Sequence, residues 1–181
     1  MNDKRRRFEA QALPHLDAAY NLARWLARPP IDADDIVQEA ILRAYRGFDG
    51  FRGGDAKPWL LAIVRNCFFT AVGHARQRKN VPLPEDGAAD HGDALIDKSP
   101  DPELAAVHAN RSRKLDQIVA GLPQEFREVL VLREMEDLSY RDIAQATGAP
   151  IGTVMSRLAR ARALVKEKWL RDVEGVRHVM P

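Results

Sequence analysis

The feature that most constrains this fold is the stretch from Leu138 to Leu170, LSYRDIAQATGAPIGTVMSRLARARALVKEKWL. Ser139 and Asp142 match the N-cap and capping-box positions of a helix. Gly148 is the residue type that ends a helix in the left-handed conformation, and we expect a second helix from about Thr153. A short helix, a glycine turn and a longer helix predict a helix-turn-helix, whose second helix lies in the major groove of DNA.

The second of these helices is basic, with Glu167 the one acid between Arg157 and Arg171. Arginine can fork onto guanine edges, and serine and threonine can bond bases or phosphates. A solvated basic face on an ordinary surface helix is the alternative, but the glycine turn and the capped helix before it favour DNA contact. At about 100° per residue, the side chains suited to DNA share one flank: Thr153, Ser156, Arg157 and Arg160.

The net charge of +2 hides a strong segregation of charge along the chain. Residues 1–80 carry fourteen Lys and Arg against nine Asp and Glu, a net of +5. Residues 81–104 carry one Lys against seven acids, a net of −6, and residues 105–181 carry thirteen against ten, a net of +3. Two basic blocks separated by an acidic one predict two nucleic-acid-facing domains and a linker that repels DNA.

Several classes of function are excluded or disfavoured by what the sequence lacks. There is no phosphate loop, no HExxH and no nucleophile in a turn signature, so we do not expect an enzyme. The five histidines are scattered and Cys67 is alone, so we expect no metal site and no cofactor. No apolar run follows the basic N-terminus or is long enough to span a bilayer. We therefore expect a cytoplasmic protein without membrane insertion.

In the first basic block, residues 1–80, the pattern predicts an amphipathic helix over residues 8–28 that two prolines end. A second helix follows, capped by Asp32. Projection of the second helix places Ile36, Val37, Ala40, Ile41, Ala44 and Phe48 on a core face. A narrow stripe opposite gathers Asp35, Gln38, Glu39, Leu42 and Arg46. The stripe could be an ordinary solvated face, but Leu42 is an apolar anchor within it, as in protein–protein contacts.

A glycine-rich loop, FDGFRGGDAKP, follows and carries Phe48 and Phe51, which the pattern leaves exposed. The next helix, from Trp59 to Val72, is apolar nearly all round and should be central to the core, and it emerges into a basic end. Aromatic side chains beside a basic helix end could stack on unpaired bases. Plain core packing is the alternative for these phenylalanines.

The fold class predicted from these elements is all-α, with two small helical domains joined by a flexible acidic linker. The first domain covers residues 1–79 and the linker covers 80–101, where Pro, Gly, Ala and Asp predominate. The second domain covers 102–171 and contains four helices, two of which form the helix-turn-helix. Residues 172–181 are expected to be a frayed tail.

Three motifs in a fixed order give this chain a specific resemblance. DADDIVQEAILRAY, PWLLAIVRNCFFTAVGHARQR and the long stretch LPQEFREVLVLREMEDLSYRDIAQATGAPIGTVMSRLARAR occur in sequence, with the acidic segment before the third. In this it resembles the extracytoplasmic-function (ECF) sigma factors, the compact two-domain group of bacterial RNA polymerase initiation factors. The resemblance covers nearly the whole chain and implies promoter-directed transcription initiation in a stress- or signal-responsive regulon.

The resemblance also implies roles for particular residues. The first motif would bind the β′ clamp helices of core polymerase through Asp32, Asp35, Gln38, Glu39 and Leu42. The loop and second motif would recognise the −10 element and assist strand opening through Phe48, Phe51, Trp59, Arg65, Asn66 and Arg76. The third would read the −35 element through Arg141, Thr153, Ser156, Arg157 and Arg160.

Partners implied by the resemblance are RNA polymerase core, promoter DNA and an inhibitory anti-sigma factor. Two other interpretations remain open at this point. A sigma-like decoy would bind the anti-sigma factor without touching DNA, but it has no use for Arg157 and Arg160. A free-standing helix-turn-helix repressor would bind duplex DNA without polymerase, but it has no use for the stripe from Asp35 to Leu42.

Overall fold

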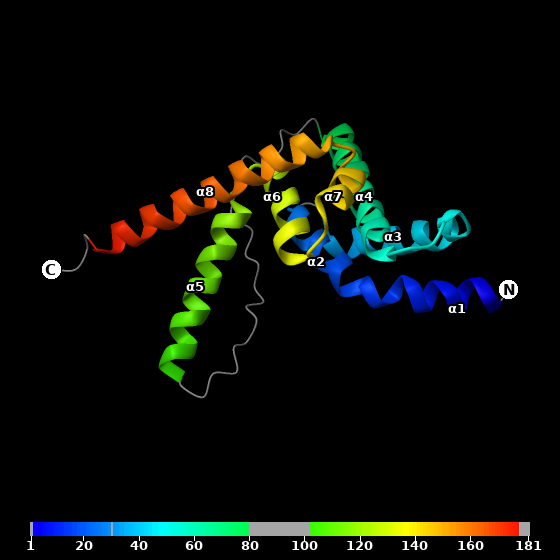
Figure 1. Ribbon diagram of the computed structural model, residues 1–181, viewed down its shortest axis with the longest axis horizontal. Helices are drawn as coiled ribbons and strands as arrows, with labels where there is room; N and C mark the ends of the chain where they lie inside the picture. Colours follow the sequence, from blue (N-terminus) through cyan, green and yellow to red (C-terminus); the bar gives the residue numbers. More distant parts are fainter. Residues whose placement is uncertain (1, 30, 80–101, 178–181) are drawn as a thin grey trace.

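The computed structural model describes residues 2–29, 31–79 and 102–177, and the predicted linker, residues 80–101, lies outside them. Every regular element in the described ranges is a helix, which agrees with the all-α expectation (Figure 1). In chain order these are α1 (Asn2–Gln11), η1 (Leu13–His15), α2 (Leu16–Leu26), α3 (Ala33–Gly47), η2 (Phe48–Gly50), α4 (Ala56–Lys79), α5 (Pro102–Ala120), α6 (Gln124–Leu130), η3 (Val131–Met135), α7 (Tyr140–Thr147) and α8 (Ile151–Arg177).

The single helix expected over residues 8–28 is wrong. The chain forms α1, the short 3-10 turn η1 and then α2, with Pro14 inside the turn. Proline cannot donate a backbone hydrogen bond, and its ring collides with the preceding turn of an α-helix. The break lets Phe8 and Ala12 of the first segment and Leu22 of the second be buried in the same core.

Capping and apolar patterning explain α3 and α4. The carboxylate of Asp32 accepts a hydrogen bond from the Asp34 backbone N–H at 2.9 Å, as an N-cap should. The apolar face of α3 is buried, as predicted, at Ile36, Val37, Ala40 and Ala44. The expected centrality of α4 is also confirmed, because Leu60, Leu61, Val64, Cys67, Phe68 and Val72 are all buried.

The helix-turn-helix has the predicted local chemistry. The Asp142 backbone N–H donates to the Ser139 hydroxyl at 3.1 Å, and that hydroxyl donates to the Asp142 carboxylate at 2.5 Å. Gly148 ends α7 at φ 68°, in the left-handed region. Helix α8 begins at Ile151, slightly before the predicted start, and continues to Arg177, through much of the segment predicted to be a frayed tail.

The two halves of the chain pack against each other, whereas the sequence predicted two separate bodies on a slack tether. Helix α4 packs against α7, and α2 packs against α6 and η3. One contiguous core cluster therefore includes buried side chains of both halves. Helix α5 and the distal part of α8 project away from this packed centre (Figure 1).

The turn at Gly148 gives a test of backbone conformation without a packing change. A Cβ at Gly148 would meet no heavy atom within 4 Å, so Gly148→Ala should cost only the left-handed conformation, about 1–2 kcal/mol of unfolding free energy. Gly47 also has open space but lies at φ −84°, so Gly47→Ala is the matched control and should not destabilise. Chemical denaturation measures both, and equal effects would contradict the assignment.

Candidate nucleic-acid and protein interfaces

The stripe on α3 is presented to solvent. Asp35, Gln38 and Leu42 are exposed on this helix, and the Leu42 side chain keeps 51% of its surface accessible. Glu39 is half-buried and accepts a hydrogen bond from the Arg43 guanidinium at 2.6 Å, while Asp32 is exposed at the cap. A large apolar side chain held open between acidic and amide groups is suited to protein contact.

The aromatic residues of the glycine loop form a packed cluster instead of an exposed platform. Phe48 is 0% exposed and makes an edge-to-face contact with Phe8, with 5.3 Å between the ring centroids. Phe51 stacks on Phe48 at 5.8 Å and contacts Trp59 at 5.0 Å. The helical projection that placed Phe48 on the core face is confirmed. The exposed loop position also expected for Phe48 is wrong, because its ring fills the space between α1 and the loop. Phe51 and Trp59 are half-buried and retain accessible surface.

The three polar residues predicted on α4 differ in their environment. Asn66 and Arg76 are exposed. Arg65 is held instead: its guanidinium donates to the Glu128 carboxylate on α6 and lies over the Phe69 ring at 4.5 Å. Only 19% of the Arg65 side chain is accessible, so this cation faces the second half of the chain and not open solvent.

Glu128 is the buried carboxylate in this contact, with 3% of its side chain accessible. Burial raises the pKa of Glu128 above its ordinary value of 4.5, because water can no longer stabilise the charge. Arg65 and, from α8, Arg157 act in the opposite direction and lower that pKa. The net direction is upward, so the two arginines offset the desolvation only in part.

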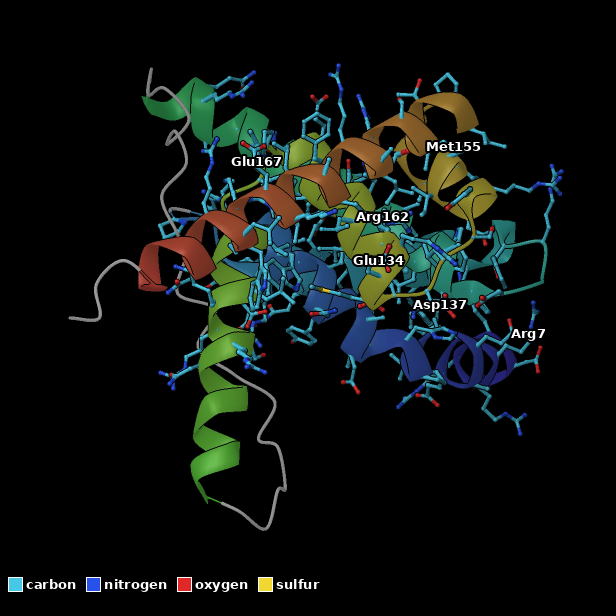
Figure 2. All side chains as sticks on the ribbon, turned by 60° about the vertical axis from the view of Figure 1, so that its left-hand side comes forward. Arg7, Glu134, Asp137, Met155, Arg162 and Glu167 are labelled. Carbon is cyan, nitrogen blue, oxygen red and sulfur yellow. The ribbon has the colours of Figure 1, made fainter. Side chains whose placement is uncertain are left out.

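The flank of α8 that the sequence predicts to face DNA is mostly accessible. Ser156 and Arg160 are exposed, Thr153 is half-buried, and Arg141 on α7 is exposed. Arg157 is half-buried and pairs with the Glu125 carboxylate at 3.3 Å. Met155, in the first turns of α8, also points outward with 52% of its surface accessible (Figure 2).

A set of contacts between the halves was not predicted from the sequence. Glu136, just after η3, accepts hydrogen bonds from the Asn21 amide and from the Lys57 ammonium, which lies 2.9 Å from its carboxylate. The same ammonium donates to the Glu136 backbone carbonyl at 2.8 Å. Arg28 of the first half donates to the Ala120 carbonyl at the end of α5. These pairs join residues far apart in sequence, and local periodicity carries no signal for them.

Comparison with known proteins identifies the chain. Residues 13–79 match Sigma-70 region 2, and residues 112–165 match Sigma-70 region 4. The ECF RNA polymerase sigma-E factor of Haemophilus influenzae is 34% identical over 151 residues, covering 81% of this chain and 78% of that protein. The chain belongs to the ECF RNA polymerase sigma factors. Such proteins are transcription initiation factors and not enzymes.

Other relatives support the same family. The RNA polymerase sigma-H factor of Pseudomonas aeruginosa is 37% identical over 140 residues, which is 74% of this chain and 71% of that protein. The ECF RNA polymerase sigma factor SigE of Mycolicibacterium smegmatis is 32% identical over 153 residues. That alignment covers 84% of this sigma factor but only 58% of the longer relative.

Two solved structures share the fold. RpoE from Bartonella quintana, solved in complex with the anti-sigma factor NepR, superposes with a TM-score of 0.70 over 90% of this chain and 96% of that one, at 24% identity. CnrH, solved with the cytosolic domain of CnrY, gives a TM-score of 0.59 over 93% of this chain and 90% of that one, at 23% identity.

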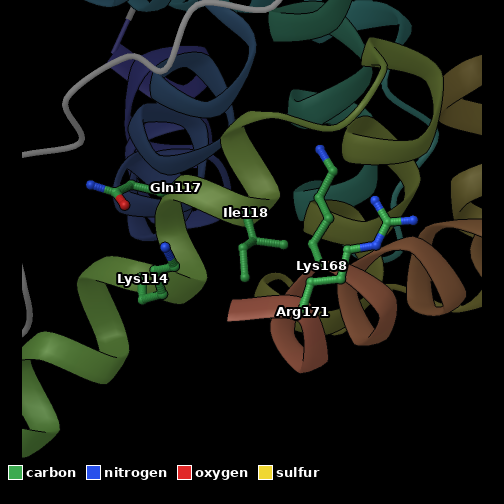
Figure 3. Close-up of a pocket in the computed structure, with 5 residues that line it drawn as sticks. All are labelled: Lys114, Gln117, Ile118, Lys168 and Arg171. Atoms are coloured by element: carbon green, nitrogen blue, oxygen red, sulfur yellow. The ribbon is translucent and has the colours of Figure 1, made fainter. Parts of the chain in front are cut away.

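Outside these surfaces, the sigma factor has a basic cleft between α5 and α8 of about 290 Å³ (Figure 3). Its lining is Lys114, Gln117, Ile118, Lys168 and Arg171. The Lys168 ammonium donates to the Gly121 carbonyl at 2.9 Å, so it caps the end of α5. Among the described residues no group of acids, histidines or cysteine could hold a metal ion, and no helix is long and apolar enough to cross a membrane.

The raised pKa of Glu128 predicts that the free energy of unfolding depends on pH. The unfolded carboxyl releases its proton near pH 4.5 while the folded one still holds it, so wild type should lose stability relative to Glu128→Gln as the pH rises above that value. The difference in unfolding free energy between wild type and Glu128→Gln levels off once the pH passes the raised pKa of Glu128 in the folded state. Urea unfolding across pH 4–8 measures it, with Glu134→Gln, which removes an exposed charge, as control. A pH-independent difference would contradict the raised pKa.

Proposed function

We propose that this ECF sigma factor directs RNA polymerase core to promoters by dividing recognition among three surfaces. The α3 stripe docks on the β′ clamp helices, α4 and its preceding loop hold the opened −10 strand, and α8 reads the −35 duplex. The match of both sigma-70 regions, in order, to the elements that carry these surfaces supports the proposal. The domain limits are those of the sequence: 1–79 for the first, 80–101 for the linker and 102–171 for the second.

The α3 surface is suited to polymerase because its apolar and charged parts are presented together. Leu42 supplies an apolar anchor, and Asp35 and Glu39 flank it with negative charge. Burying the leucine gives binding energy, while the acids fix orientation against a basic partner. The buried face of α3 keeps the helix rigid, so little order has to be gained on binding.

The α8 surface is suited to a major groove because the helix projects its polar flank outward. Arg160 and Ser156 are exposed on it, and Met155 adds an accessible apolar side chain. Val154, Leu158 and Ala161 are buried on the opposite side and fix the rotation of the helix. Arginine can read guanine and apolar groups can contact thymine methyls, so this flank combines both forms of direct readout.

The α4 surface supplies cations and aromatic edges for unpaired DNA. Arg76 and Asn66 are exposed, and Trp59 and Phe51 are accessible in part. Stacking and phosphate contacts of this kind would offset the cost of unstacking a base, a few kcal/mol. Phe48 has a different role: it is fully buried and braces the loop that carries Phe51.

Regulation by an anti-sigma factor is part of the proposal, and the structural likeness supports it. RpoE was solved with the anti-sigma factor NepR, and the likeness covers both halves of this chain. We infer an inhibitor that grips the same polymerase-facing and DNA-facing surfaces, release of the sigma factor in response to stress or another signal, and action in the cytoplasm.

Reversing charge on the α3 stripe should weaken polymerase binding without unfolding the chain. Asp35→Lys/Glu39→Lys puts two cations where a basic partner surface would dock, and it should reduce co-purification with core polymerase at least about tenfold, that is, by 1.4 kcal/mol. Glu9→Lys is the control, because Glu9 also lies in an exposed ion pair, with Arg5 at 2.7 Å. Undiminished binding of the double variant would refute docking through α3.

Removing the exposed arginine from the reading flank should weaken duplex binding. Arg160→Ala should cost about 1–3 kcal/mol toward a duplex selected from random sequence by the reconstituted holoenzyme, and should relax the preference at one position. Arg171→Ala is the control on the same helix. Arg171 lies outside this flank and pairs with Glu167 at 2.6 Å, so its removal should change duplex binding little. Fluorescence anisotropy measures the affinity of both variants for the duplex. Equal losses would show that α8 binds DNA only as a non-specific basic surface.

A further inference from the structure

Helix α1 carries a concentration of positive charge that none of the three proposed surfaces uses. Its residues 4–7 are four cations in a row, KRRR. Neither matched sigma-70 region includes this helix, since the first begins at residue 13. We propose that α1 is a further contact for single-stranded DNA, in which Arg7, together with Arg52 of the neighbouring loop, binds phosphate groups of the opened strand. The inference rests on the proposed function in one respect, because it takes the loop after α3 as the place where that strand lies.

Tertiary packing holds α1 against this loop, so the helix is not a loose basic tail. Phe8 keeps 4% of its surface and packs edge-to-face on both Tyr45 and Phe48, with 5.3 Å between the ring centroids in each case. The turn that contains Pro14 ends α1, and α1 lies beside η2 at the start of the loop (Figure 1). A helix fixed by a buried ring presents its charges at defined positions, so little order has to be gained on binding.

An acid of the loop is neutralised from α1. The Lys4 ammonium lies 2.6 Å from the Asp49 carboxylate of η2, and it also lies over the Tyr45 ring at 5.2 Å from the centroid. Asp49 keeps 71% of its side chain accessible, so its charge alone would repel a phosphate group. The pairing with Lys4 offsets that repulsion and leaves the net charge of this surface to its arginines.

Arg7 lies over the aromatic cluster with its donors still accessible. Its guanidinium carbon is 5.6 Å from the centroid of the Phe48 ring, on which Phe51 stacks. The Asp3 carboxylate is 4.0 Å away and 79% accessible, so water screens this pair strongly. The Arg7 side chain keeps 53% of its surface accessible and lies at the edge of the molecule (Figure 2). A guanidinium in this position can bind two phosphate oxygens at once.

Arg52 brings a second cation to the same cluster. It follows Phe51 directly, is exposed, and makes no ion pair with any residue that the structure describes. Phe51 and Trp59, with 5.0 Å between their ring centroids, keep accessible surface beside it. Cations that follow a backbone, next to aromatic rings that stack on bases, are typical of proteins that bind single strands. An acidic protein partner would need the arginines but not the accessible rings, so the composition of this surface favours single-stranded DNA.

An ordinary solvated helix face is the alternative for these cations, and it predicts that the arginines of α1 are interchangeable. Arg5 and Arg7 are two residues apart, which places them roughly 160° apart around the helix. Each pairs with an exposed acid four residues away, Arg5 with Glu9 at 2.7 Å and Arg7 with Asp3 at 4.0 Å. Arg5→Gln is therefore the matched control for Arg7→Gln, because both remove one cation and one pair of the same kind from the same helix.

The test measures binding of a fluorescent single-stranded oligonucleotide to holoenzyme reconstituted with the full-length chain. The oligonucleotide is the −10 strand of a duplex that wild-type holoenzyme selects from random sequence. For single strands, each phosphate contact contributes roughly 0.7 to the slope of log K against log salt, which is roughly fivefold in affinity at about 0.1 M salt. Arg7→Gln should lower the slope and the affinity by these amounts, and adding Arg52→Gln should double the change in slope. Arg5→Gln should change neither, and an effect equal to that of Arg7→Gln would overturn the inference.

Neutral methylphosphonate linkages locate the contact on the strand. When the phosphates are replaced one at a time, the linkage that Arg7 binds should weaken binding of the wild-type holoenzyme. The same linkage should have little further effect on Arg7→Gln, because the interaction has already been lost from the protein side. Losses that add independently at every linkage would overturn a contact between Arg7 and a phosphate.

A conservative variant separates the charge of Arg7 from its packing on the Phe48 ring. Arg7→Lys keeps the charge and loses the planar guanidinium, so it should keep most of the salt slope. A loss of affinity in Arg7→Gln at unchanged slope would show that Arg7 only braces the ring, and would overturn the inference. Arg52→Gln alone covers the case in which Arg7→Gln fails to fold. Arg52 is exposed, and its removal should lower the slope by roughly 0.7.

The remaining outcomes separate this inference from the proposed function. A wild-type holoenzyme that does not bind the strand would defeat the proposed role of the loop and this inference together. Strand binding by wild type, with an unchanged slope in Arg7→Gln/Arg52→Gln, would overturn the role of α1 and leave the proposed function intact. If the double variant lowered only co-purification with core polymerase, α1 would be a protein contact, and the inference would again be overturned.

Discussion

The structure depends on the contact between cationic and amide groups of the first half and carboxylates of the second. Glu128 and Glu136 are both buried, and both are satisfied by donors that come from the other half of the chain. A buried carboxylate without a partner would be strongly unfavourable, so these donors dictate which faces can meet. The buried apolar side chains shared by both halves then supply the driving force for packing, and the polar contacts supply its register.

The same packing divides the surface of the sigma factor into accessible and covered parts. The α3 stripe and the polar flank of α8 lie outside the packed centre, and their exposed side chains are ready for a partner. The α4 surface is divided, since Asn66 and Arg76 are open while Arg65 is covered.

The polar contacts between the halves add specificity to the packing more than they add stability. Buried ion pairs contribute little net stability, since the loss of hydration largely cancels the attraction between the charges. The upward pKa of Glu128 shows this cancellation at one of the two contacts. The polar contacts therefore fix which faces of the two halves meet, while the buried apolar side chains supply most of the free energy of packing.

The sequence by itself determined the local structure and the family. The cap at Ser139, the left-handed Gly148, the buried faces of α3 and α4 and the exposure of Leu42 follow from interactions within a few residues or from helical periodicity, and these the pattern predicts. It did not predict the break at Pro14. It placed Phe48 both on the core face of a helix and in an exposed loop, and the packing of α1 against the loop decides between the two. Only the tertiary structure decided that the halves pack together and that Arg65 faces Glu128. Those contacts join residues 63 or more positions apart, and periodicity in a sequence carries no information about which distant partner a side chain will meet.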